Sequence, residues 1–142
     1  MKNNKGFSLV ELIIVIAIMA ILAGALAPAL IKYINKSRKS TDISNGDLIA
    51  KAVTTALAEE AGFEACTKTS YSSSDLCKDG DAFTDETHST LGASSMKVKY
   101  GKNKGGDFTI VVDKANNKCI VYAAKTAAPD DQVYPEQGKN YK

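Results

Sequence analysis

The longest hydrophobic pattern in the chain lies near its N-terminus. From Leu12 to Ile31, 20 consecutive residues carry neither a charge nor a side-chain hydrogen-bonding group. As a helix, this run would be about 30 Å long, which matches the hydrocarbon core of a bilayer. A helix of a soluble protein is rarely apolar on all sides over such a length. The pattern therefore predicts a membrane-spanning helix.

A second pattern continues the helix with a narrower apolar face. Between Leu48 and Leu57 the apolar residues recur at the spacing of an amphipathic helix: Leu48, Ile49, Ala52, Val53, Ala56 and Leu57. We therefore expect one long helix from Phe7 to about Ala61, apolar all round at first and half-buried later. The polar segment 44–47 could mark a kink or a new N-cap, and Gly62 is a plausible stop.

The remaining sequence predicts a small sheet. Hydrophobic and polar residues alternate over 96–100, 108–112 and 119–123, with glycine, asparagine and lysine in the two connections. We expect a three-stranded antiparallel meander within 96–124, packed with one face on the helix, so the fold class is α+β. The polar segment 62–95 reads as a variable loop, and 125–142 as a tail without a strong pattern.

One charge interrupts the first apolar stretch. Glu11 is the only charged residue between Leu9 and Ile31. A carboxylate in the middle of a membrane helix costs roughly 2.5–3.5 kcal/mol on insertion scales. Such a residue needs a partner, and its position needs an explanation.

The residues around this charge resemble a known processing site. The stretch Gly6-Phe7-Ser8-Leu9-Val10-Glu11 follows a short leader with two lysines and precedes the apolar helix. This arrangement resembles the processing site of type IV pilins, and the likeness covers the leader and the first helix. It implies that a prepilin peptidase cuts between Gly6 and Phe7 on the cytoplasmic face. It also implies that the new amine is methylated, which makes Phe7 an N-methylphenylalanine.

The apolar segment by itself also allows three other interpretations. A secretory signal peptide would use Ala25-Leu26-Ala27 as its cleavage site, but the apolar run is longer than usual. A plain single-pass anchor leaves Glu11 unexplained, and a lipoprotein would need a cysteine near the segment. Lys2 and Lys5 precede the helix, whereas four basic residues follow it closely: Lys32, Lys36, Arg38 and Lys39. The positive-inside rule alone would thus favour the wrong side, and only the resemblance implies a cytoplasmic N-terminus.

Cleavage after Gly6 would supply a partner for Glu11. The new α-amine of Phe7 has a reference pKa near 8 and is mostly protonated at neutral pH. If Glu11 pairs with the Phe7 amine of a neighbouring chain, both charges are neutralised and the axial offset between subunits is set. A local pair between Glu11 and its own N-terminus is the alternative. Gly24 and Pro28 predict a kink in the helix, because proline removes a hydrogen bond and glycine lowers helix propensity.

Together these features predict a leader at 1–6, a transmembrane and fibre-core helix at 7–31, and a globular pilin domain at 32–142. The predicted function is a structural subunit of a type IV pilus that supports adhesion and twitching motility. Its partners would be other pilin subunits in a helical homopolymer, the prepilin peptidase and the pilus assembly machinery. The subunit would be a single-pass protein of the cytoplasmic membrane before assembly and part of an extracellular pilus afterwards. The alternatives are a pseudopilin of a type II secretion or DNA-uptake system, and a membrane-tethered extracellular binding domain. Lysine dominates the basic residues, which suggests an AT-rich genome and a low-GC Gram-positive source.

The three cysteines predict at most one disulfide. A bridge between Cys66 and Cys77 would stabilise the fold by about 3 kcal/mol in the chain-entropy model, and two reduced thiols are the alternative. Cys119 lies in a predicted strand and should point into the core as a small hydrophobe. Many pilins close a C-terminal loop with a disulfide, and this chain has no cysteine after Cys119 with which to do so.

No pattern in the sequence indicates an enzyme or a cofactor. His88 is the only histidine and lies in a segment rich in serine and threonine, where a solvated side chain is expected. Four acidic residues form a weak calcium candidate without EF-hand spacing: Asp79, Asp81, Asp85 and Glu86. Four lysines flank Tyr100 and could contact nucleic-acid phosphates, but protection of an exposed strand explains them better: Lys97, Lys99, Lys102 and Lys104.

Overall fold

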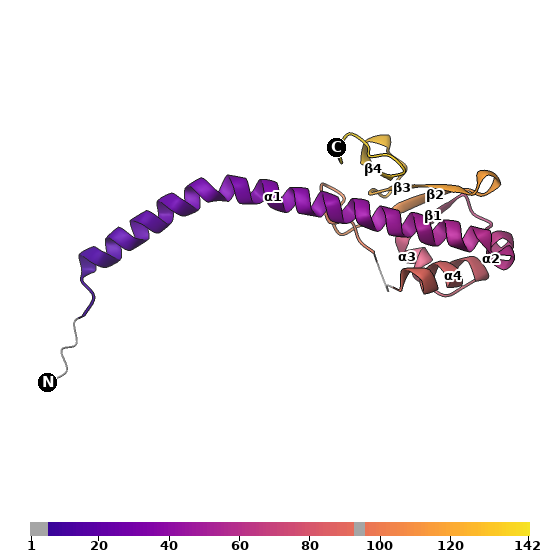
Figure 1. The fold of residues 1–142 in the computed structure, drawn as a ribbon, viewed down its shortest axis with the longest axis horizontal. Helices are drawn as coiled ribbons and strands as arrows, with labels where there is room; N and C mark the ends of the chain where they lie inside the picture. The colour runs from indigo at the N-terminus through magenta and orange to yellow at the C-terminus, as the bar shows by residue number, and fades with distance from the viewer. Residues whose placement is uncertain (1–5, 93–95) are drawn as a thin grey trace. The chain divides into compact units, whose positions relative to one another are not determined.

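The computed structural model describes residues 6–92 and 96–142, and the chain divides into two compact units, Met1–Lys36 and Ser37–Lys142. Helix α1 spans Leu9–Ala58 (Figure 1). The long N-terminal helix is therefore confirmed, with an end three residues before the predicted one. A short helix α2 (Glu60–Ala65) follows it directly.

The segment 44–47 is not a new N-cap, because α1 continues through it. Gly46 is buried in the helix, and a Cβ atom at this position would lie 2.7 Å from Cγ2 of Val133. Glycine is needed here because the backbone of α1 approaches another part of the chain closely. Gly62 lies inside α2 rather than ending α1, and a Cβ there would meet the carbonyl oxygen of Ala56.

The sheet has four antiparallel strands in the order β1-β2-β3-β4. Strands β2 (Thr109–Asp113) and β3 (Lys118–Tyr122) form the central hairpin, as the alternating pattern predicts. Strand β1 (Ser70–Ser72) lies at one edge and β4 (Gln132–Tyr134) at the other. A short 3₁₀ turn, η1 (Lys114–Asn116), closes the hairpin, and a second, η2 (Pro129–Asp131), leads into β4.

The prediction of a strand at 96–100 was wrong, and the sheet has four strands where about three were expected. This segment forms one isolated bridge, between Lys97 and Asp107, and is not a strand. The amides of Lys99 and Tyr100 donate instead to the carboxylate of Asp42, so they are not free to form a ladder. The two edge strands come from segments expected to be loop and tail, and β4 joins β3 beside an irregularity at Val121 and Tyr122.

The segment 62–95 also contains more regular structure than expected. Besides α2 and β1 it holds helices α3 (Ser73–Leu76) and α4 (Ala82–Leu91). Each of these two helices begins with a capping box, in which the side chains and backbone amides of two residues bond reciprocally: Ser72 with Asp75, and Asp81 with Thr84. α4 ends at Gly92, whose positive φ of 59° suits a left-handed cap.

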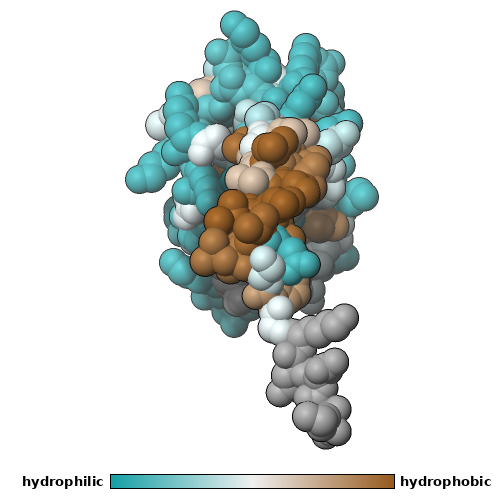
Figure 2. Space-filling model, turned by 90° about the vertical axis from the view of Figure 1, so that its left-hand side faces the viewer, coloured by the Kyte–Doolittle hydropathy of each residue, from teal (hydrophilic) through white to brown (hydrophobic). Residues whose placement is uncertain are grey.

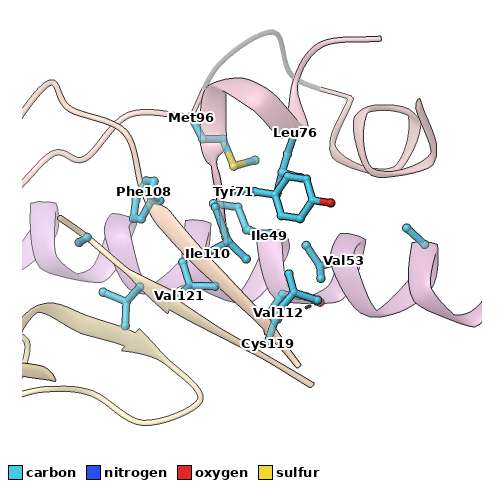
Figure 3. Close-up of a cluster of buried hydrophobic side chains, with 14 of the residues drawn as sticks. Ile49, Val53, Tyr71, Leu76, Met96, Phe108, Ile110, Val112, Cys119 and Val121 are labelled. Carbon is cyan, nitrogen blue, oxygen red and sulfur yellow. Dashed lines mark hydrogen bonds between the residues drawn. The ribbon is translucent and has the colours of Figure 1, made fainter. Parts of the chain in front are cut away.

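The core of the second unit lies between α1 and the sheet (Figure 3). Ile49 and Val53 of α1 pack with Ile110 and Val121, which are opposite each other in β2 and β3. The core also includes side chains from β1 and from segments outside the sheet: Tyr71, Leu76, Phe83, Met96 and Phe108. Burial of this apolar surface is the main force that holds the unit together.

The cysteines all belong to this interior. Cys119 is buried and packs in the core, as predicted. Cys66 and Cys77 are buried free thiols in the described chain, so the candidate bridge between them is not formed. Burial raises the pKa of the Cys119 thiol to about 11 and also raises that of Cys77.

Candidate functional site

The start of α1 gives Glu11 a local hydrogen bond. The helix begins at Leu9, so Ser8 is the N-cap residue and Glu11 the third helical residue. The backbone N–H of Ser8 donates to Oε2 of Glu11 over 2.9 Å. This contact is one half of a capping box, which the spacing Ser8-x-x-Glu11 signals in the sequence and which the sequence reasoning missed. In the single chain, Glu11 therefore stabilises the first turn of its own helix.

The first half of α1 exposes its apolar side chains. Phe7 is 81% exposed and Ile21 is 72% exposed, and the apolar residues between Leu9 and Ile31 have no buried member. Figure 2 shows the resulting hydrophobic surface as a continuous brown area. Within the described part of the chain, one helix is long and apolar enough to cross a membrane, and it is this one.

Gly6 and Gly24 have no crowded neighbours. A Cβ atom added at Gly6 or at Gly24 would meet nothing within 4 Å. α1 continues past Pro28, and its ribbon curves in the apolar half (Figure 1). The structure is helical on both sides of Pro28, and the kink expected at Gly24 and Pro28 stays a prediction.

The acidic residues of 79–86 serve local structure. The carboxylate of Asp81 caps α4 by accepting the Thr84 amide at 2.8 Å, and Asp85 accepts the Gly80 amide at 2.9 Å. His88 lies within α4 rather than in a loop, and its Nδ1 is 2.7 Å from Oδ1 of Asp79. Among the described residues, no three metal-ligating side chains come together, and the calcium candidates are not assembled into a site.

The lysines around Tyr100 have different neighbours. Nζ of Lys97 lies 2.6 Å from Oδ1 of Asp107, and the same carboxylate accepts hydrogen bonds from Ser73 and Ser74. Burial raises the pKa of Asp107, but the hydrogen bonds from Lys97 and the two serines outweigh it, and the pKa is lowered. The side chains of Lys99, Lys102 and Lys104 are exposed.

A buried carboxylate that the sequence reasoning did not single out connects three distant segments. Asp42 is fully buried in α1 and accepts the amides of Lys99 at 2.7 Å and Tyr100 at 2.9 Å, and the hydroxyl of Tyr141 at 3.0 Å. Burial raises the pKa of Asp42, and the three donors oppose that shift. Nζ of Lys39 adds a hydrogen bond to the carbonyl of Lys142 at 3.3 Å. These contacts hold the C-terminal segment against α1.

Comparison with known proteins identifies the family. Residues 1–27 match the family model described as the prokaryotic N-terminal methylation motif. The chain is 34% identical over 135 residues to the type IV major alpha-pilin of Moraxella bovis, an alignment that covers 94% of this chain and 82% of that protein. The chain belongs to the type IV pilins. It is also 29% identical over 123 residues to the type IV major fimbrial protein FimA of Dichelobacter nodosus, covering 87% of this pilin and 79% of FimA.

As a type IV pilin, the protein is a structural subunit of a pilus. Both relatives come from Gram-negative bacteria, so the expected low-GC Gram-positive source has no support from them. No solved structure matches the chain.

Proposed function

We propose that this pilin is made with a leader of residues 1–6, is cut between Gly6 and Phe7 by a prepilin peptidase, and is methylated on the new amine of Phe7. The observation that supports this most directly is the combination of a fully exposed apolar helix with a capping residue, Glu11, in its first turn. The match of residues 1–27 to a methylation motif points the same way.

The glycine at position 6 is best explained by the peptidase that processes the chain. A Cβ atom at Gly6 would meet nothing within 4 Å, so the described part of the chain does not itself require glycine there. A peptidase that must bring the backbone close to its catalytic groups does require a small residue. Gly6→Ala should therefore leave the fold intact and reduce processing.

Residues 7–31 then serve two environments in turn. In the cytoplasmic membrane, the exposed side chains face lipid with the N-terminus inside. In the extracellular fibre, the same side chains face the helices of neighbouring subunits. The assembly machinery exchanges one apolar environment for another, so extraction from the bilayer does not expose this surface to water for long. The globular domain at 32–142 remains on the outside of the fibre and supports adhesion and twitching motility.

Glu11 takes on a second role after cleavage. In the single chain it accepts the Ser8 amide at 2.9 Å. In the fibre we propose that it pairs with the methylated amine of Phe7 in an adjacent subunit, which neutralises two charges that would otherwise be buried alone. The local hydrogen bond holds the carboxylate at the helix start, ready for this partner.

The processing proposal is tested by intact-mass and N-terminal analysis of protein sheared from cells. A chain that starts at methylated Phe7 supports it. A chain that starts at Met1 or Pro28, with no sheared filaments, contradicts it. Gly6→Ala should accumulate as full-length protein in the membrane.

The role of Glu11 is tested by two substitutions compared side by side. Glu11→Gln keeps an amide oxygen that can accept the Ser8 N–H but removes the charge, whereas Glu11→Ala removes both. If charge pairing drives assembly, both variants are processed and both lose filaments. If filaments of the Gln variant are normal, the cap alone matters and the pairing proposal is wrong.

Filament morphology and a twitching assay on the wild type separate a pilus from a short pseudopilus.

A further inference from the structure

We infer that two oppositely charged ends of the globular unit bind each other between neighbouring copies of this pilin, which fixes how far one subunit is shifted along the fibre relative to the next. This inference rests on the proposed function, because it needs parallel copies packed side by side. It concerns the surface of Ser37–Lys142 and a different neighbour from the one that would pair with Glu11. Phe7 and Glu11 are four residues apart, so their pairing implies a shift of about 6 Å. In a helical fibre each subunit has neighbours at more than one axial shift.

The basic end is defined by four exposed lysines: Lys99, Lys102, Lys104 and Lys125. Three of them line one hollow of about 310 Å³, together with the turn at Gly105 and Gly106. The fourth, Lys99, is held against α1, because its backbone amide donates to the carboxylate of Asp42. The stretch 96–106 contains four lysines and no carboxylate, so this end has a positive field.

Three carboxylates close to the basic end are occupied inside the subunit. Asp107 is paired with Lys97 at 2.6 Å, and Asp42 accepts two backbone amides. Asp131 is buried and accepts the side-chain amide of Asn103 at 3.2 Å. None of the four lysines of the basic end forms an ion pair within the described part of the chain. They are available to a partner outside the subunit.

The acidic end lies where α1 passes into α2. It is defined by six exposed carboxylates at the start of α2, within α2, which packs against α4, and around the start of α4: Glu59, Glu60, Glu64, Asp79, Asp81 and Asp85. The three aspartates also contact groups of their own subunit, whereas the three glutamates form no ion pair among the described residues. The stretch 59–91 holds eight carboxylates and two lysines, Lys68 and Lys78. Lys114 also reaches this end but is half-buried, with Nζ bonded to the carbonyl of Cys66 at 3.2 Å. The end therefore keeps a negative field.

The two ends are separated along α1. Asp42, beside the basic end, and Glu59, at the acidic end, are 17 residues apart in sequence, which corresponds to about 25 Å of helix. Figure 1 shows α2 and α4 at one end of the unit, away from the C-terminus. A parallel copy shifted by this distance brings its acidic end to the basic end of its neighbour. Copies without a shift would place like charges together.

Such a contact is heterologous, since different surfaces meet, and its repetition builds an open filament rather than a closed ring. Opposite charges mainly supply orientation and register, while the apolar helices supply most of the affinity. The charge pattern thus selects one stagger among those that the uniform apolar surface of the first helix would allow.

The first test uses wild-type filaments. Subunits labelled with ¹⁵N and unlabelled subunits are co-assembled, and the sheared filaments are treated with a carbodiimide, which joins lysines to adjacent carboxylates. Mass spectrometry of mixed-isotope peptides then maps contacts between subunits. We expect links that join the lysines of the basic end to residues 59–64 or 79–86. Filaments in which intersubunit links join other surfaces overturn the inference, whereas a wild type without filaments would instead contradict the proposed function.

The second test is reciprocal charge reversal in the full chain. Glu60→Lys with Glu64→Lys, and Lys102→Glu with Lys104→Glu, should each reduce sheared filaments at least fivefold. Combining both pairs should restore them to within twofold of the wild type. The control, Lys68→Glu with Lys78→Glu, makes the acidic end more negative and should not reduce assembly. If both reversed chains accumulate in the membrane and the combination assembles no better than either alone, the inference is wrong, and if a variant fails to accumulate, the wild-type link map decides.

Discussion

The strongest test of the fold concerns the buried carboxylate of Asp42. It accepts three hydrogen bonds, from the amides of Lys99 and Tyr100 and from the hydroxyl of Tyr141, over 2.7 to 3.0 Å. Asp42→Ala would leave all three donors without this acceptor in a site that is fully buried around the carboxylate. An unpaired buried donor costs about 1–3 kcal/mol, so three such donors predict a loss of roughly 3–6 kcal/mol, allowing for water that reaches the half-buried amides. Total domain stability is about 5–15 kcal/mol, so the loss would be severe.

The measurement is urea unfolding of the full-length pilin in detergent micelles, followed by circular dichroism. Hydrogen exchange of the Lys99 and Tyr100 amides gives a second readout that reports directly on the two lost hydrogen bonds. Tyr141→Phe is the matched control, since it removes one of the three donors and should cost only about 1 kcal/mol. In the Asp42→Ala background the same substitution should cost almost nothing, because the acceptor is already gone.

Two results would refute this reasoning. One is an Asp42→Ala protein whose free energy of unfolding falls no further than that of Tyr141→Phe. The other is additive effects of the two substitutions, which would show that Tyr141 and Asp42 stabilise the fold independently. Unchanged exchange of the Lys99 and Tyr100 amides would show that another acceptor replaces the carboxylate.

Three further predictions concern packing, pH dependence and thiol reactivity. Gly46→Ala should lower the free energy of unfolding by about 1 kcal/mol, because overpacking against Val133 exceeds the gain in helix propensity. The loss should be smaller in a Val133→Ala background, which removes the contact with Cγ2 at 2.7 Å. A stabilising effect in the wild-type background would contradict the close contact. Asp107 has a lowered pKa in the folded state, so its stabilising contribution is complete above its ordinary pKa of 3.8 and is lost as the pH falls below that value. Asp107→Asn should therefore flatten the acid limb of a plot of stability against pH, and an unchanged limb would rule out the pair with Lys97 as its source. Cys119, whose pKa is raised to about 11 by burial, should resist alkylation at pH 8 until urea is added, and labelling of the folded protein would disprove its burial.

The elements that sequence patterns predicted well are those specified by nearby residues. The helix of Leu9–Ala58 follows from apolar spacing within a few turns, and the β2–β3 hairpin follows from alternation on both sides of a short turn. Helix α4 escaped notice because few of its side chains are strongly hydrophobic: Phe83 provides most of its buried apolar surface, and Thr84 and Thr87 are buried beside it. Its capping box at Asp81 was the available signal.

The predicted strand at 96–100 failed for a different reason. Its alternating pattern is genuine, and Met96 and Val98 are buried in the core. Yet the amides that a strand would use for pairing donate to Asp42, a residue 57 positions earlier in the chain. A local pattern indicates which side chains are buried, but it does not indicate which acceptor the backbone finds.

The N-terminal residues alone were enough to predict the family to which this pilin belongs. Gly6, Phe7, Glu11 and the 20 apolar residues form a signal that is contiguous and matched to the thickness of a bilayer, so no tertiary contact is needed to interpret it. Only the tertiary structure decided that Asp42 holds the C-terminal segment and that the charges of the globular unit separate into two ends. These features depend on residues up to 99 positions apart in the sequence. Burial of the apolar faces of α1 and the sheet against each other brings these residues together, along with the segments that connect them.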